Sequence, residues 1–132
     1  LQYNLANMSQ ELTWQLIKKH NCFLIKRDGV LFSTEANNLT NQNSFKYSGL
    51  ANNSTVGVEI NKDGKGCVLV TKKKSSAARR RPAKAYNRTV LRKDFRRVAR
   101  TIKAETQGKN YRGDLTSAAL ARWTKISQIK SA

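Results

Sequence analysis

Short runs rich in β-branched, aliphatic and aromatic residues occur in two pairs along the chain, and Val56, Val58 and Ile60 also alternate with other residues, a pattern that predicts β-strands. Residues 22–27 and 30–35 flank Asp28-Gly29, a dipeptide typical of a two-residue hairpin turn, where both residues need a positive φ. Residues 55–60 and 66–72 flank a polar turn, and the continuous apolar run at 67–70 is typical of the centre of a sheet. The pattern therefore predicts two β-hairpins.

Apolar residues recur with a helical period in three other segments. Residues 10–19 predict a helix capped by Ser9, with its apolar side chains facing a support. A second helix should begin at Asn87 or Thr89 and stop by Gly108, and a third should begin at Asp114. The expected stripe of the second is Leu91, Phe95, Val98 and Ile102; that of the third is Leu115, Ala119, Trp123 and Ile126.

Charge divides the 132 residues unevenly. Residues 1–70 contain seven basic and five acidic side chains, a net charge of +2, whereas residues 71–132 contain 19 and three, a net charge of +16. Residues 72–84 have two triple basic clusters and no apolar side chain larger than alanine, so they cannot fold on their own. We expect a polyanion as a constitutive partner.

These patterns predict an α+β fold: a small antiparallel sheet of two hairpins with an N-terminal helix, then a basic extended arm and two C-terminal amphipathic helices. The expected divisions are a compact body at 9–71, the arm at 72–86, which orders on RNA, and a helical, RNA-facing region at 87–132. Met8 is the single methionine, from which we hypothesise that residues 1–7 precede the start codon.

Enzyme chemistry finds no support in the distribution of reactive side chains. The acidic residues occupy expected turns and helix caps or stand alone, and His20, the one histidine, follows the first helix. Cys22 and Cys67 are too few and too far apart for a zinc cluster, and we expect both to be buried, reduced thiols. We therefore expect no catalytic residues, metal, cofactor or small-molecule substrate. No run approaches the ~20 apolar residues of a membrane span, so the chain is expected to be intracellular.

Residues 35–54 combine six asparagines with Phe45, Lys46 and Tyr47, too polar for a core element and too aromatic for a simple linker. Asparagine side chains brace turns and tolerate left-handed backbone, but they also hydrogen-bond to bases and 2′-hydroxyls. Both interpretations of this loop remain open.

A nucleic acid is the expected polyanion, and RNA fits best. The chain has no helix-turn-helix, zinc-finger or zipper pattern, and no aromatic RNP motif. An α+β body with a basic arm suits packed RNA helices, where phosphates crowd. The candidate RNA-binding residues are Lys46, Lys72, Lys73, Lys74, Arg79, Arg80, Arg81, Lys84, Arg88, Arg92, Arg96, Arg97, Arg100, Arg112 and Arg122.

Five ordered motifs resemble the L28e family of eukaryotic large-subunit ribosomal proteins. They are Phe23-Leu24-Ile25-Lys26-Arg27; Ser33-Thr34-Glu35 with Asn37-Asn38-Leu39; Asn43 to Leu50; Val56-Gly57-Val58-Glu59; and Asp63-Gly64-Lys65-Gly66. The similarity extends over roughly residues 12–126 through Trp14, Arg81-Pro82-Ala83, Tyr86, Arg88-Thr89, Tyr111-Arg112 and Asp114-Leu115. Ala36 and Gly113 stand where the family commonly has proline, and we expect the chain to lack the long basic tail of animal members.

The resemblance implies a non-catalytic structural protein of the cytosolic large subunit that is bound to rRNA and neighbouring ribosomal proteins, and is not a homo-oligomer. It also implies passage through the nucleus and nucleolus during assembly. The alternatives are a nucleolar ribosome-assembly factor of the same superfamily, the Mak-sixteen type, and another basic RNA-binding protein.

Overall fold

The computed structural model describes residues 9–75 and 81–131 and confirms the α+β class. The described chain runs through helix α1 (Gln10–Ile17), strands β1 (Leu24–Arg27) and β2 (Val30–Ser33), and strands β3 (Val56–Ile60) and β4 (Cys67–Lys72). It continues through 3₁₀-helix η1 (Pro82–Lys84), strand β5 (Tyr86–Leu91) and helix α3 (Phe95–Lys103). The π-helix η2 (Ala104–Gly108), 3₁₀-helix η3 (Gly113–Leu115) and helix α4 (Thr116–Ser131) complete it.

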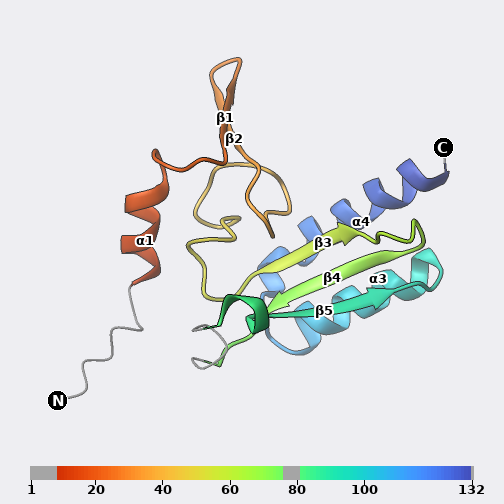
Figure 1. The fold of residues 1–132 in the computed structure, drawn as a ribbon. Helices are drawn as coiled ribbons and strands as arrows, with labels where there is room; N and C mark the ends of the chain where they lie inside the picture. The colour runs from red at the N-terminus through yellow and green to blue at the C-terminus, as the bar shows by residue number, and fades with distance from the viewer. Residues whose placement is uncertain (1–8, 76–80, 132) are drawn as a thin grey trace.

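Strands β3, β4 and β5 form an antiparallel meander, one face of which is covered by α3 and α4 (Figure 1). In its register Val58 lies opposite Leu69, and Cys67 lies opposite Leu91, so these side chains share the face toward the helices. The core between the sheet and the helices consists of Leu39, Val56, Val58, Cys67, Leu69, Val98, Ile102, Leu115, Ala119, Trp123 and Ile126. The stripe predicted for the last helix is therefore confirmed as buried.

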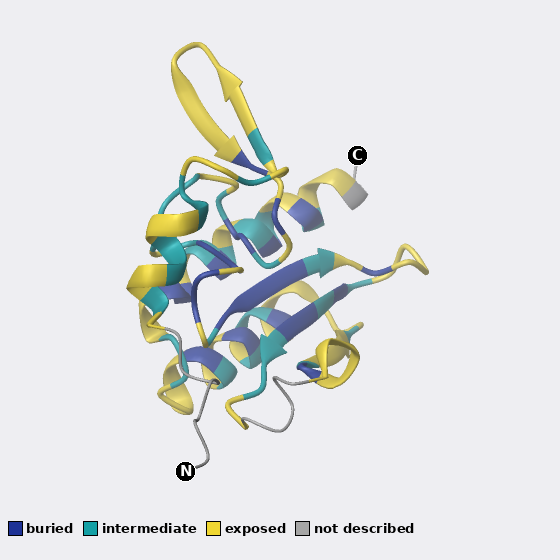
Figure 2. Ribbon diagram, turned by 60° about the vertical axis from the view of Figure 1, so that its left-hand side comes forward, coloured by how far each residue is buried: buried dark blue, intermediate teal, exposed yellow. Residues whose placement is uncertain are grey.

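The first hairpin has the predicted turn, with Asp28 at φ 48° and Gly29 at φ 78°. The second hairpin, β3–β4, also lies where the alternation predicted it. The sequence had suggested one sheet made of both hairpins. The structure instead places the two hairpins in different sheets. β1 and β2 form a separate two-stranded sheet that projects from the body (Figures 1 and 2).

The second predicted helix is present as α3, but its expected start at Asn87 or Thr89 is wrong, because residues 86–91 form β5 and α3 begins at Phe95. The β5 strand pairs with the far edge of β4, from Lys72 opposite Tyr86 to Cys67 opposite Leu91. Of the expected stripe, Val98 and Ile102 are buried on α3, whereas Leu91 reaches the same core from a strand. Pairing with β4 satisfies backbone groups that a longer helix would have left unpaired at that edge.

The basic arm predicted over residues 72–86 is wrong at both ends of that range. Lys72 is the last residue of β4, and the backbone N–H of Lys73 donates to the carbonyl of Ala85 at 2.8 Å. Pro82 begins η1, after which Tyr86 enters β5. The basic segment is thus the connection of a hairpin closed at its base. Arg79 and Arg80 lie outside the described residues, as do residues 1–7.

Helix α1 differs from the expected supported helix because none of its residues is buried, and Leu12 and Leu16 are exposed. Trp14 contacts Phe45, with the ring centroids 6.1 Å apart. The expectation of two buried thiols also fails in part, since Cys67 is buried but Cys22 is exposed.

The asparagine-rich loop is braced by its own side chains. The amide of Asn52 donates to the carbonyls of Phe45 and Ser48, and the amide of Asn38 donates to the carbonyl of Gln42. Asn37, at φ 61°, adopts the left-handed backbone that asparagine tolerates. The bracing interpretation of the loop therefore applies to these residues.

Candidate nucleic-acid interface

Candidate cations from separate parts of the sequence gather at one end of the three-stranded sheet, where β3 begins, β4 ends and β5 begins. Strand β4 brings Lys72 to this end, and Lys73 and Lys74 follow it. Arg81 and Lys84, at η1, arrive from the other side of the connection and are exposed. We call this group, together with Lys46, the basic end.

Tyr111 is hydrogen-bonded to the backbone at the basic end. Its hydroxyl lies within hydrogen-bonding distance of the carbonyls of Thr55, directly before β3, and of Lys72, the last residue of β4. Burial raises the pKa of the Tyr111 phenol, so the hydroxyl keeps the proton that it donates. The ammonium of Lys74 lies 5.6 Å from the centroid of the Tyr111 ring, a cation–π distance. The ring thus sets the position of one candidate cation.

The guanidinium of Arg112 is hydrogen-bonded to groups within the protein. Its side chain is 17% exposed, and its guanidinium donates to the carbonyls of Ser54 at 3.0 Å and Lys46 at 2.9 Å. It also forms a bidentate pair with Asp114, with both N–O distances 2.9 Å. These bonds lower the pKa of Asp114, an effect that burial of the carboxylate only partly offsets. Arg112 therefore fixes the backbone from which the exposed Lys46 side chain extends.

The face of the sheet that is turned away from the helices carries a row of alternating β5 residues. Arg88 and Val90 lie on this face because their partners on β4, Val70 and Val68, alternate with the core residues. Tyr86 heads the row and is half-buried. Sequence reasoning missed Tyr86, although a strand reading of its alternation with Arg88 and Val90 would have placed all three on one face.

Arg88, in β5, and Arg92, directly after it, each form an ion pair with an acidic side chain. Arg88 lies 3.4 Å from Glu59, and Arg92 lies 2.6 Å from Asp63 at the β3–β4 turn. All four side chains are at least 40% exposed, and such surface pairs contribute only about 0–1 kcal/mol. A stronger anion such as a phosphate can therefore replace the carboxylates at little cost.

Helix α3 presents its cations on the side opposite its core contacts. Arg96, Arg100 and Lys103 recur at helical spacing and are exposed, while Val98 and Ile102 are buried. Arg97 pairs with Asp94 at 3.2 Å, whereas the structure gives Arg96 and Arg100 no ion pair with any described residue. These two guanidinium groups are available to an external anion.

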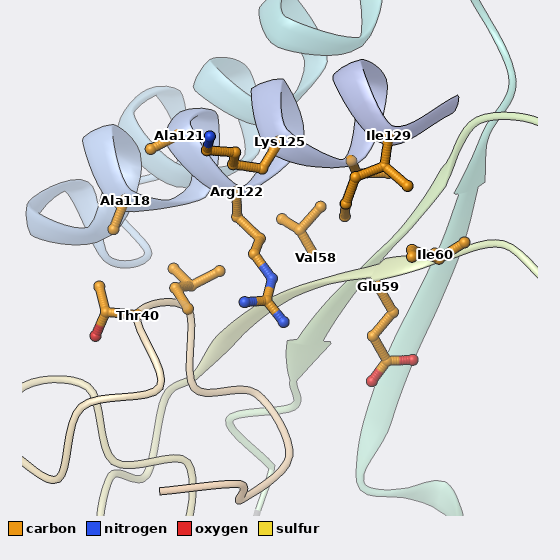
Figure 3. Close-up of a pocket in the computed structure, with 11 residues that line it drawn as sticks. Thr40, Val58, Glu59, Ile60, Ala118, Ala121, Arg122, Lys125 and Ile129 are labelled. Carbon is orange, nitrogen blue, oxygen red and sulfur yellow. The ribbon is translucent and has the colours of Figure 1, made fainter. Parts of the chain in front are cut away.

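Arg122 stands apart from the other candidates, on α4 beside β3. It lines a groove of about 670 Å³ whose walls include Val58, Ile60 and Ile129. Figure 3 shows its side chain extending from α4 to the level of β3, whereas Lys125 lies along the helix. The structure therefore does not bring Arg122 together with the basic end.

Neither a metal site nor a membrane span is found in the part of the chain that the structure describes. Over residues 9–75 and 81–131, no cluster of three or more His, Cys, Asp or Glu side chains could hold a metal ion. No helix in these ranges has both the length and the apolar character that a membrane crossing requires.

A small α+β body with a cluster of cations at one end of its sheet, and with exposed arginines along a helix, has the electrostatic character of a nucleic-acid-binding protein. The chain belongs to the Ribosomal L28e protein family, whose model matches residues 12–129.

Three relatives are each described as large ribosomal subunit protein eL28. The protein of Schizosaccharomyces pombe is 34% identical over 124 residues, which cover 91% of both chains. The Dictyostelium discoideum protein is 38% identical, over 95% of this chain and 92% of its own length. The Caenorhabditis elegans protein is 37% identical, over 95% and 94%. The resemblance read from the sequence motifs is thereby confirmed.

Proposed function

We propose that this protein is a structural constituent of the cytosolic large ribosomal subunit, where it binds folded rRNA and takes part in translation without a catalytic step of its own. The observation that carries this function is membership of the ribosomal family together with similarity, over more than nine-tenths of the chain, to proteins described as large-subunit components. Passage through the nucleolus during assembly and contacts with neighbouring ribosomal proteins belong to the same proposal.

The proposed RNA-binding surface has three parts. At the basic end, Lys46, Lys72, Lys73, Lys74, Arg81 and Lys84 lie along phosphates, and Arg79 and Arg80 belong to the same connection. Along β5, Arg88 and Arg92 exchange carboxylates for phosphates, and the ring of Tyr86 offers a stacking surface to a base. On α3, Arg96, Arg97 and Arg100 position the RNA backbone rather than read its sequence. Arg122 makes a separate contact, and Arg112 acts by holding Lys46 in place.

A groove between β5 and α3 supports a further contact beside Arg92 of the second part. It has a volume of about 510 Å³, and Leu91 and Val98 give it apolar walls. Arg92 and Lys93 line the same groove. Apolar walls beside guanidinium and ammonium groups suit a base that leaves its stack while its phosphates stay on the cations.

Sedimentation tests the proposed function directly. A tagged chain should co-sediment with large subunits, complete ribosomes and polysomes. A chain found with pre-ribosomal particles but absent from polysomes would instead be an assembly factor. A chain found in neither would be another type of basic RNA-binding protein.

Charge-matched variants test the surface. Substituting Arg96 and Arg100 by alanine removes two exposed cations that form no ion pair with a described residue, and it leaves two alanines, which favour a helix. We expect weaker incorporation into subunits, and the slope of log K against log salt for the purified chain on rRNA should fall by about 1.4–1.8, at 0.7–0.9 per phosphate contact. Alanine at Lys19 and Lys125 removes the same charge elsewhere and should change the slope by less. Equal slopes in the two double variants would contradict the placement on α3.

A further inference from the structure

The β1–β2 hairpin is largely exposed (Figure 2), and several of its exposed residues are apolar. Exposed fractions are 50% for Val30, 41% for Leu31, 40% for Ile25 and 37% for Phe32. Ile25 lies opposite Phe32 on one face, and Leu31 lies opposite Lys26 on the other, so neither face is polar throughout. A two-stranded hairpin is only marginally stable by itself in water, and this one gains little from burial. Such a combination indicates that another surface covers the hairpin.

The outer edge of β1 is open. Thr34 donates its backbone N–H to the carbonyl of Phe23, which makes residues 23 and 34 a hydrogen-bonded pair across the strands. By alternation from this pair, Leu24 and Lys26 direct their N–H and C=O groups away from β2. No described residue bonds to those groups. The opposite edge of β2 is covered, because Asn41 accepts from Ser33 and Asn43 donates to Leu31.

Charge distinguishes the hairpin from the proposed RNA surface. Residues 23–33 hold Lys26, Arg27 and Asp28, a net charge of +1 within a chain of net charge +18, and all three charges lie at the tip. The sides of the hairpin are aliphatic and aromatic. Branched aliphatic side chains neither stack on bases nor bond phosphates, and covering them with RNA would desolvate phosphates without compensation. In Figure 1 the hairpin also points away from β5 and α3.

We propose that the hairpin is a docking site for an extended segment of another protein, which adds a strand to the open edge of β1. The backbone groups of Leu24 and Lys26 bond to the added strand, and Ile25 and Phe32 pack against its apolar side chains. A carboxylate on the partner complements Lys26 and Arg27 at the tip. This docking surface is separate from the proposed RNA interface. The docking proposal therefore does not depend on the proposed ribosomal function.

A photo-cross-linking experiment tests the site in cells that synthesise the tagged chain. A benzophenone amino acid replaces Phe32, whose aromatic shape it keeps, and a second chain carries it at the exposed Ala83 of η1. We expect the adduct at position 32 to be one protein other than this chain, resistant to ribonuclease and identified by mass spectrometry. An adduct with RNA, with a second copy, or no adduct at position 32 would overturn the docking site.

Backbone and side-chain variants test how the partner binds. Lys26→Pro removes an outward N–H that β2 does not use, whereas Lys26→Ala removes the same charge and keeps the N–H. The adduct at position 32 should be lost in the first and kept in the second; the same result in both would refute strand addition. Ile25→Asp should abolish the adduct without a backbone change, and Leu12→Asp, at an exposed site on α1 outside both proposed surfaces, should not. An adduct that persists in Ile25→Asp refutes the apolar contact even where Lys26→Pro fails to fold.

Sedimentation of ribosomes from lysates of the same cells distinguishes a failure of the docking proposal from a failure of the proposed function. A protein adduct at position 32 on a chain absent from ribosomes would retain the docking site and reject the ribosomal role. RNA adducts at both positions on a chain found in polysomes would do the reverse.

Discussion

Replacing Arg112 by alanine should destabilise the fold more than any surface ion pair can explain. The guanidinium is largely buried and bonds to the carbonyls of Ser54 and Lys46, which precede it in sequence by 58 and 66 residues. Hydrogen bonds from a charged donor contribute about 1.5–3 kcal/mol each, and the partial exposure of one of them reduces the total. We expect a loss of roughly 2–4 kcal/mol in the free energy of unfolding. Urea unfolding, followed by tryptophan fluorescence, measures it.

Asp114→Asn is the matched control, because it weakens the ion pair and leaves the carbonyl bonds intact. The carboxylate is 45% exposed, so this variant should lose no more than about 1 kcal/mol. The double variant then gives the coupling energy between the two side chains. If Arg112→Ala lost under about 1 kcal/mol, or no more than Asp114→Asn, the carbonyl bonds would not hold the Lys46 segment as described.

The same pair predicts a dependence on pH. The folded-state pKa of Asp114 is lowered, so its contribution is complete above the unfolded pKa of about 4 and is lost as pH falls through the lower folded value. Arg112→Ala removes the main cause of that shift. The stability difference between the natural chain and Arg112→Ala should therefore narrow below about pH 4. A difference that stays constant with falling pH would contradict the coupling.

Two further predictions use matched pairs within the chain. Gly64 and Gly66 both have a φ of 73°, but a Cβ would meet no atom at Gly64, whereas at Gly66 it would lie 1.9 Å from the carbonyl oxygen of Leu91. Alanine should therefore cost roughly 1 kcal/mol at Gly64 and roughly 3 or more at Gly66, and equal losses in urea unfolding would argue against this packing. A maleimide should modify the exposed Cys22 in the folded chain and the buried Cys67 only after denaturation; comparable rates for the two thiols would contradict their placement.

Elements encoded by neighbouring residues were predictable, and those decided by distant pairing were not. Asp28-Gly29 defines the first hairpin by itself, and the stripe of the last helix ends in the core as expected. The β5 strand was mistaken for helix because Leu91 keeps helical spacing with Phe95 and Val98. Its actual conformation depends on the edge of β4, which no local pattern of residues 86–91 reveals.

The candidate interface divides in the same way. Composition indicated that the cations belong to the second half of the chain, but it could not distinguish Arg112 from Arg96. Arg112 donates to distant carbonyls, whereas Arg96 forms no ion pair with an acidic residue in the part of the chain that the structure describes. Such a distinction depends on the tertiary structure, because both residues are arginines in equally basic surroundings of the sequence.

The backbone hydrogen bond between Lys73 and Ala85 has a consequence for the evolution of this protein. This bond closes the connection between β4 and β5 where the connection leaves the two strands. Residues added or deleted between Lys73 and Ala85 therefore leave the strand register and the core undisturbed. Closure entropy varies only with the logarithm of length, and doubling such a connection costs about 0.6 kcal/mol. The number of cations carried there can therefore drift between lineages almost independently of thermodynamic stability, so this part of the surface could adapt to changes in the proposed RNA partner.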